Sequence, residues 1–167
     1  MIQHYFYTNA TNDAGIRTKI FKRAKQNLPN TLLFVNDYGI LLNKYDRLNQ
    51  YVEQIRGLLD EGAPIEGIGI QSHFTDNEAA DPIKIKEALD LLWTTFQLPI
   101  WMTEFDWSDG SEIADGNHTR HAEQLDNFYR MSFSHPGVEG ILMWGFWDQI
   151  NNRYIQYNKK EQQQTRD

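Results

Sequence analysis

Short runs of consecutive apolar residues divide the chain into repeating units. The runs occupy residues 32–35, 68–70, 99–102 and 140–144. Polar residues do not alternate with apolar ones inside them, and continuous runs of this kind are typical of strands in a parallel sheet covered on both faces. Successive runs lie roughly 30 to 40 residues apart, the length of a strand, a crossover helix and two loops. The pattern therefore predicts four parallel strands.

The segments between the runs carry apolar residues at helical spacing. The clearest helix covers residues 48–59 and ends at Gly62 before Pro64. A second helix begins at Asp81-Pro82, where an N-cap residue precedes proline at the first helical position. The apolar face of the first of these helices comprises Leu48, Tyr51, Val52, Ile55, Leu58 and Leu59, and that of the second Ile85, Ala88, Leu89, Leu92 and Phe96.

Two further helices complete the alternation. One precedes the first strand and contains Ile16, Ile20, Phe21 and Ala24. The other starts at Asn117 and is expected to place Ala122, Leu125, Phe128, Tyr129 and Phe133 inward. Helix and strand thus alternate four times along the chain.

This alternation predicts the fold class and the domain boundaries. A complete (β/α)₈ barrel needs about 250 residues, whereas this chain has 167. We therefore expect an α/β fold consisting of half a TIM (β/α)₈ barrel, with four parallel strands and intervening helices over residues 1–157. The polar tail, residues 158–167, has no apolar face and is predicted to be disordered.

Charge and composition narrow the classes of partner. The formal net charge of −7 argues against a nucleic-acid partner, which normally requires clustered Lys and Arg, and favours a neutral substrate. No apolar stretch approaches membrane-spanning length, and the first residues of the chain lack the pattern of a signal peptide. The chain has no Cys, and its five His show no HExxH pattern, so we expect no metal site and no cofactor.

Polar or aromatic residues follow each predicted strand, in residues 36–38, 71–73, 103–106 and 144–148. In βα barrels such residues, at the carboxyl ends of the strands, form the active site. A polar residue at a strand end is more often a helix cap or a turn residue. Four such groups together, with Trp144 and Trp147 in the last, favour a carbohydrate site. Trp147 could equally serve only in packing.

Glu104 and Asp106 are the strongest candidates for chemistry. They lie two residues apart on an extended segment, so their side chains project to the same side. Two close carboxylates repel each other unless a donor lies beside them. His73, at the end of the neighbouring strand, is a suitable donor that could bridge both and keep Glu104 ionised. The alternative is a core histidine satisfied by the backbone.

Four sequence blocks, LFVNDYG, GIGIQSHF, IWMTEFDW and LMWGFWD, resemble in order and spacing the last four strands of glycoside hydrolase family 10. They lie within residues 32–148, and the agreement of several motifs in order makes the resemblance specific. It implies that the half barrel is the C-terminal half of the family's catalytic domain. It also implies an extracellular parent protein that acts on xylan, a β-1,4-linked polysaccharide.

The resemblance implies a role for each candidate residue. Glu104 matches the nucleophile of a retaining endo-1,4-β-xylanase, and His73 and Asp106 match the network that supports it. The expected substrate-binding residues are Gln71, Trp144, Asn36 and Trp147. Asp37 matches a structural or supporting position beside Asn36.

The chain departs from the family pattern in two places. The acid/base glutamate is expected to end the fourth strand, immediately before a segment that resembles residues 1–7, so this chain is expected to lack it. After residue 148 the family usually places another tryptophan over the sugar, whereas this chain reads Ile150-Asn151-Asn152-Arg153-Tyr154.

Three functional hypotheses remain open from the sequence. The first is a xylanase-type domain that is inactive on xylan without the acid/base. The second is a non-catalytic carbohydrate-binding half barrel, whose open strand edges could pair edge to edge with a second copy. The third is a related β-glycanase with another substrate.

Overall fold

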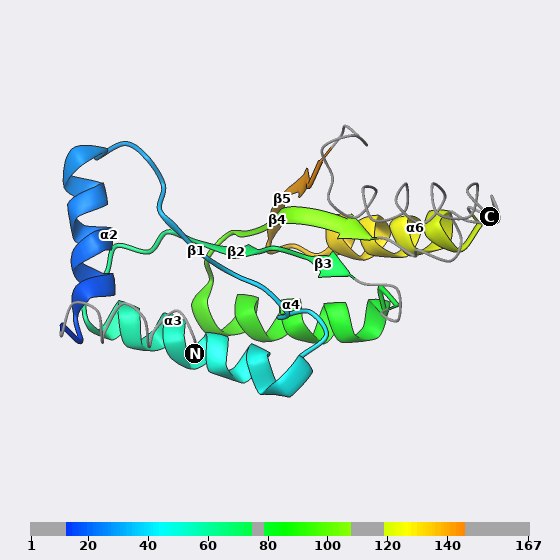
Figure 1. The fold of residues 1–167 in the computed structure, drawn as a ribbon, viewed down its shortest axis with the longest axis horizontal. Coiled ribbons are helices and arrows are strands. Elements are labelled where there is room, and N and C mark those ends of the chain that lie inside the picture. Colours follow the sequence, from blue (N-terminus) through cyan, green and yellow to red (C-terminus); the bar gives the residue numbers. More distant parts are fainter. Residues whose placement is uncertain (1–12, 75–78, 108–118, 146–167) are drawn as a thin grey trace, which may run out of the picture.

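The computed structural model describes residues 13–74, 79–107 and 119–145. Helices and strands alternate in it as the apolar runs predicted (Figure 1). The elements are α2 (Ile16–Asn27), β1 (Phe34–Asp37), the 3-10 turn η1 (Lys44–Asp46), α3 (Arg47–Asp60), β2 (Gly67–Ile70), β3 (His73–Phe74), α4 (Pro82–Phe96), β4 (Ile100–Trp107), α6 (Thr119–Ser134) and β5 (Val138–Met143). The short strand β3 was not predicted, because two residues carry no periodicity.

The sheet confirms the predicted parallel order. β1 pairs with β2, β2 with β4 and β4 with β5, all in parallel. β3 pairs in parallel with the far end of β4. Because every strand runs in the same direction, the carboxyl ends of β1, β2, β4 and β5 lie along one edge of the sheet.

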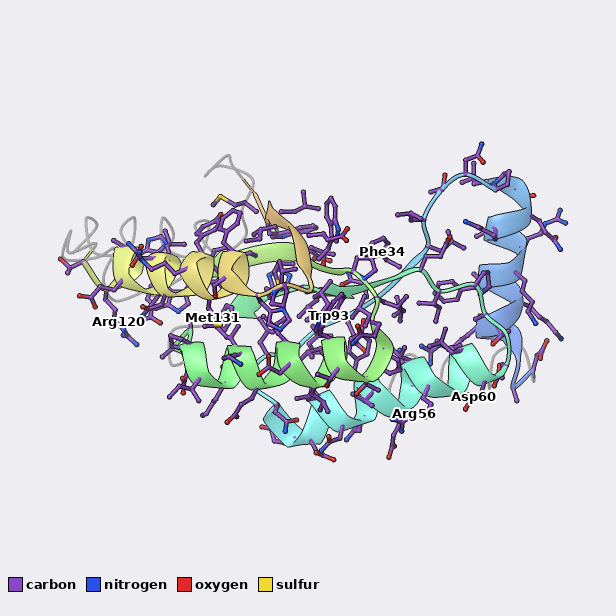
Figure 2. The ribbon with its side chains drawn as sticks, turned by 180° about the vertical axis from the view of Figure 1, so that it is seen from behind. Phe34, Arg56, Asp60, Trp93, Arg120 and Met131 are labelled. Carbon is purple, nitrogen blue, oxygen red and sulfur yellow. The ribbon has the colours of Figure 1, made fainter. Side chains whose placement is uncertain are left out.

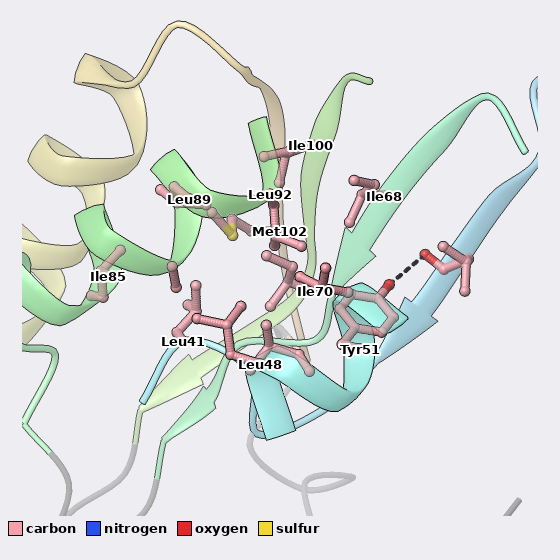
Figure 3. Packing of buried hydrophobic residues seen from close by; sticks show 14 of the residues in the cluster. Leu41, Leu48, Tyr51, Ile68, Ile70, Ile85, Leu89, Leu92, Ile100 and Met102 are labelled. Carbon is pink, nitrogen blue, oxygen red and sulfur yellow. Dashed lines mark hydrogen bonds between the residues drawn. The ribbon is translucent and has the colours of Figure 1, made fainter. Parts of the chain in front are cut away.

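The hydrophobic core lies between the sheet and helices α3 and α4, which cover one side of it (Figure 1). All four residues of β2 are buried, as expected for a strand covered on both faces. Ile68 and Ile70 of β2 meet Ile100 and Met102 of β4 in this core (Figure 3). The predicted apolar face of residues 48–59 is buried at every position except Leu59, which is partly buried.

A buried tyrosine ties α3 to two strands. Tyr51 is 2% exposed, and its hydroxyl lies 3.0 Å from the carbonyl oxygen of Val35 (Figure 3). The same hydroxyl lies 2.8 Å from the carbonyl oxygen of Gly69. Burial raises the pKa of Tyr51 well above its ordinary value, with the negative charge of Asp37 adding to the effect. The hydroxyl therefore stays protonated and links the backbones of β1 and β2.

Aromatic rings lie on the other face of the sheet, where glycines leave room for them. A Cβ on Gly67 would come within 2.2 Å of the Phe34 ring, and one on Gly140 within 2.6 Å of Trp101. The two rings meet edge to face with 6.2 Å between centroids. Figure 2 shows Phe34 on the side of the sheet opposite Arg56 of α3. This is the face that would line the inside of a barrel.

Several predictions about burial were wrong. Ala122 was expected to point inward but is exposed. Phe133 was expected to point inward but is 76% exposed. Five residues along a helix correspond to a rotation of about 140°, so Phe133 cannot share the inward stripe of fully buried Phe128. β5 was expected to be covered on both faces, yet Leu142 and Met143 are about half exposed or more, at 49% and 61%.

The first helix is the least integrated of the described elements. α2 buries only Thr18, and it lies at one end of the molecule (Figure 1). Phe21 packs against the hydrophobic core from this helix. Polar contacts add to this link: Thr18 donates to the Glu61 carboxylate, and Lys25 pairs with Glu66 at 2.7 Å. Among the helices of the described residues, none is both long and apolar enough to span a bilayer.

Candidate active site

An irregularity in the inward and outward alternation of β4 places its acidic residues on the face of the sheet opposite α3 and α4. Burial alternates along β4 until Thr103 and Glu104, which are both half-buried, and then resumes with buried Phe105. The pairing with β5 shifts register in the same interval, between Met102 and Phe105. This is the signature of a β-bulge, which re-aims side chains at a functional edge. Thr103, Glu104 and Asp106 consequently share one side of the sheet.

A turn after β2 aims His73 at these carboxylates. Ser72 adopts a left-handed backbone with φ of 64°, and its buried hydroxyl donates to the Ile70 carbonyl at 3.0 Å. The chain then pairs His73 directly opposite Asp106 in the β3–β4 ladder. The sharp turn therefore places the imidazole beside the acidic pair.

The imidazole of His73 bridges the two carboxylates, as the sequence led us to expect. Its Nδ1 lies 2.8 Å from Oδ1 of Asp106, and its Nε2 lies 3.2 Å from Oε2 of Glu104. The pKa of His73 is raised above its ordinary value, chiefly by the hydrogen bond to Asp106, with burial opposing the shift and the Glu104 contact adding to it. Protonated His73 can donate to both carboxylates at once, whereas the neutral ring has a single N–H.

The second oxygen of Glu104 is held from β1. Nδ2 of Asn36 donates to Oε1 of Glu104 at 3.2 Å. The hydroxyl of Thr103 in turn donates to Oδ1 of Asn36 at 2.9 Å. Each oxygen of the Glu104 carboxylate thus accepts one N–H, from Asn36 on one side and His73 on the other.

Trp144 flanks this cluster at the end of β5. Its ring meets the His73 ring edge to face at 5.9 Å, and its backbone N–H donates to the Phe105 carbonyl at 2.8 Å. The indole is 53% exposed. A fixed and exposed aromatic ring beside a carboxylate is a platform on which a sugar ring can stack.

The comparisons with known proteins decide the family. The profile described as glycosyl hydrolase family 10 matches residues 6–162, which is nearly the whole chain. This chain belongs to glycosyl hydrolase family 10. The four motif blocks and the Glu104 cluster lie inside the matched region, so the resemblance noted from the sequence is confirmed.

Curated relatives of this family 10 chain include enzymes and a regulator. Endo-1,4-beta-xylanase 1 of Arabidopsis thaliana is 42% identical over 155 residues, covering 92% of this chain and 15% of that protein. Anti-sigma-I factor RsgI6 of Acetivibrio thermocellus is 36% identical over 153 residues, covering 92% of this chain and 18% of that protein. The chain therefore spans less than a fifth of the length of these two relatives.

Solved structures support the fold of a partial barrel. Native xylanase 10B of Thermotoga maritima superposes with a TM-score of 0.71 at 27% identity, covering 82% of this chain and 42% of that one. A thermostable mutant of a Cellvibrio japonicus xylanase gives a TM-score of 0.74 at 22% identity, covering 88% and 48%. The family 10 chain matches less than half of each of these chains.

The structure separates the expected site residues of this family 10 domain into three groups. It brings Glu104, His73, Asp106, Asn36 and Trp144 together. Gln71 follows β2 and is half-buried, and its backbone N–H donates to the Asp37 carbonyl at 3.0 Å. Trp147 lies outside the described residues. Within the described part of the chain, no group of three or more His, Cys, Asp or Glu is arranged to hold a metal ion.

The sequence reading missed the role of Thr103 in this cluster. It named Thr103 only as part of a polar strand end. A strictly alternating strand would turn Thr103 away from Glu104, and the bulge that reverses this leaves no mark in the sequence. Contact between Thr103 and Asn36 therefore required the three-dimensional structure.

Proposed function

We propose that this family 10 domain supplies the nucleophile of a retaining endo-1,4-β-xylanase reaction, and that Glu104 is that nucleophile. The observation that carries the proposal is the pair of N–H groups, from Asn36 and His73, on the two oxygens of the Glu104 carboxylate. These two hydrogen bonds fix the orientation of the carboxylate, which an attacking oxygen requires.

In this proposal Glu104 attacks the anomeric carbon of the sugar. The bond from a Glu104 oxygen to that carbon forms as the bond to the leaving-group oxygen breaks, and the leaving oxygen takes a proton from a second carboxyl group. Water then attacks the same carbon, transfers a proton to that second group, and releases Glu104. Retaining enzymes place the second carboxyl about 5 to 5.5 Å from the nucleophile. We place this acid/base outside these 167 residues, in the part of the barrel that the chain does not match.

The supporting residues have separate tasks in the reaction. Asp106 holds His73 at Nδ1, so Nε2 remains directed at Glu104. When Glu104 becomes esterified to the sugar it loses its negative charge, whereas the hydrogen bond between Asp106 and Nδ1 of His73 remains and keeps the imidazole in place. The cluster therefore stays assembled for the second step.

Xylan is the substrate that we propose, on two grounds. Several curated relatives are named endo-1,4-beta-xylanase, and one matching structure, of an intracellular xylanase from Thermoanaerobacterium saccharolyticum, holds xylotetraose. The exposed Trp144 offers the flat apolar surface on which a neutral sugar ring stacks. We also propose an extracellular parent protein, which fractionation of the source cells and medium would test.

An activated glycoside tests the proposal without the acid/base. A 2,4-dinitrophenyl 2-deoxy-2-fluoro-β-xylobioside has a leaving group that needs no proton, and its fluorine slows breakdown of the glycosyl-enzyme. We expect the chain to gain the mass of one fluoroxylobiosyl group, on the peptide containing Glu104. We expect no release of sugar from xylan by the same chain, since general acid catalysis contributes roughly 10²- to 10⁴-fold. A label on another residue, or equal labelling of Glu104→Gln, would contradict the assignment of Glu104.

A second candidate function is binding of the polysaccharide without cleavage. The observation that favours it is the 36% identity to a protein named as an anti-sigma-I factor and not as a xylanase. Under this alternative the chain binds xylo-oligosaccharides through Trp144, and Glu104→Gln binds them equally well. Titration calorimetry with xylotetraose, combined with the labelling experiment, separates the two functions.

We also propose that the open edges of the sheet associate. Within the described residues, β1 has β2 as its strand partner and β5 has β4, so each presents one free edge. Unpaired edges of this kind are prone to pair with another chain. A two-fold arrangement could join β5 of one copy to β1 of the next in parallel. Sedimentation equilibrium tests this, and a strictly monomeric, cooperatively folded chain would contradict it.

A further inference from the structure

We propose that Thr103 is a positioning residue for Glu104, acting through the side-chain amide of Asn36. This inference rests on the proposed function of Glu104 and names a residue to which neither the motif nor the comparisons give a role. The two hydrogen bonds form a relay from β4 to β1 and back to β4, with Thr103 and Glu104 adjacent in sequence.

The orientation of the Asn36 amide decides whether Glu104 faces a donor or an acceptor. An asparagine side chain can present either its oxygen or its NH₂ group to a neighbour. An ionised Glu104 can only accept, so it requires the NH₂ group. The Thr103 hydroxyl donates to Oδ1 of Asn36 at 2.9 Å and holds the amide in the orientation that directs Nδ2 to Glu104 at 3.2 Å.

The side chain of Asn36 needs the support of Thr103. Asn36 is exposed, and its side chain is free to rotate unless its neighbours fix it. Thr103 is β-branched and therefore has a restricted χ1 angle. The rigid hydroxyl on the bulged strand thus fixes the flexible amide on β1.

The space that the Asn36 side chain occupies depends on a glycine of β2. Gly69 lies directly opposite Asn36 in the β1–β2 ladder. A Cβ on Gly69 would come within 2.8 Å of Oδ1 of Asn36 and 3.1 Å of its Cβ and Cγ. The glycine therefore gives the amide room to lie across β2 and reach the Thr103 hydroxyl and the Glu104 carboxylate on β4.

The relay mirrors the arrangement on the other oxygen of Glu104. There His73 donates to Glu104 and is itself held by Asp106. Each donor to the nucleophile thus has its own holder: Asp106 for the imidazole and Thr103 for the amide. Loss of a holder should leave the donor present but misdirected.

The experiment compares Thr103→Val with Thr103→Ser in the 167-residue chain. Valine keeps the shape of threonine and removes the hydroxyl, whereas serine keeps the hydroxyl. The first measurement is the NMR position of the Asn36 side-chain NH₂ resonances, which requires no catalysis. We expect Thr103→Val to shift them toward the values of a free amide, as Glu104→Ala should by removing the acceptor, and Thr103→Ser to retain them. Unmoved Asn36 resonances in Thr103→Val would overturn the relay.

The second measurement is the rate of labelling by the fluoroxylobioside. Loss of one neutral hydrogen bond predicts a fall of about 2- to 12-fold in the inactivation rate constant, with an unchanged inhibitor dissociation constant and rescue by Thr103→Ser. In the Asn36→Ala background, Thr103→Val should have no further effect, because Thr103 acts only through that amide. Additive losses, or a change in inhibitor affinity alone, would overturn the inference.

Gly69→Ala is an independent way to displace Oδ1 of Asn36. It removes no hydrogen-bonding group, yet it crowds Asn36, so we expect displaced Asn36 resonances and slower labelling. Gly57→Ala is the matched control, because a Cβ there meets nothing within 4 Å. If Gly69→Ala folds and behaves as the wild type in both measurements, the relay is refuted. Absence of any Glu104 label in the wild type would instead refute the proposed function, and the resonance measurement would still decide the relay.

Discussion

Tyr51→Phe is the substitution whose effect on stability the structure predicts most directly. It removes one hydroxyl and leaves the ring in its buried position. That hydroxyl lies within hydrogen-bonding distance of two backbone carbonyls, on Val35 of β1 and Gly69 of β2. The same two strands position Asn36 of the candidate site, since Asn36 follows Val35 and lies opposite Gly69.

The magnitude follows from the burial of the hydroxyl. A net intramolecular hydrogen bond contributes about 0.5–1.5 kcal/mol, and a buried polar group left without its partner costs about 1–3 kcal/mol. The hydroxyl has one proton to donate, so one of the two carbonyls loses a full hydrogen bond and the other a weaker contact. We expect Tyr51→Phe to lower the free energy of unfolding by about 1–2 kcal/mol.

Urea unfolding followed by circular dichroism measures this change. The midpoint should fall while the slope with denaturant stays constant, because the surface exposed on unfolding is unchanged. Tyr129→Phe is the matched control: its ring packs edge to face on Phe105 at 5.5 Å, and its hydroxyl makes no hydrogen bond within the described residues. If Tyr51→Phe destabilises the chain no more than Tyr129→Phe does, the stabilising link between β1 and β2 that we assign to the Tyr51 hydroxyl is wrong.

Two further predictions concern pH and helix capping. The pKa of His73 is raised in the folded chain mainly by Asp106, so His73 contributes stability that is fully present below the unfolded pKa of about 6.5. That contribution is lost as pH rises through the folded pKa. Urea midpoints measured from acid to alkaline pH should show this loss clearly in the wild type and only weakly in Asp106→Asn. Identical pH profiles of the two proteins would contradict the prediction. Asp81 caps α4 by accepting the Ile83 N–H at 3.0 Å, so Asp81→Ala should cost about 1 kcal/mol and Asp81→Asn a few tenths, as read from thermal unfolding.

The sequence predicted the parts of the fold that depend on local patterns. The apolar runs gave the order and parallel direction of the main strands, and the Asp81-Pro82 pair gave the start of α4 to the residue. The motif blocks identified the family. The strand and helix predictions are correct because burial on both faces and helix capping each require particular residue types.

The features that the sequence did not predict depend on contacts between distant segments. The bulge at Thr103 and Glu104 is a register shift against β5, and the position of Asn36 depends on Gly69 across the ladder. Leu142 on β5 is likewise exposed because none of the described residues covers it, and its own apolar character does not reveal this. Single positions cannot encode these relations.

Azide rescue of Glu104→Ala is the sharpest test of whether Glu104 is the nucleophile. Removing the nucleophile opens space for a small anion on the face of the sugar that Glu104 attacks, and a dinitrophenyl β-xylobioside supplies a leaving group that needs no acid. We expect Glu104→Ala to be inactive alone. We expect azide to restore release of dinitrophenolate, with α-xylobiosyl azide as the product, identified by its anomeric NMR coupling. Formation of the β-azide, or rescue of Asp106→Ala but not of Glu104→Ala, would contradict Glu104 as the nucleophile.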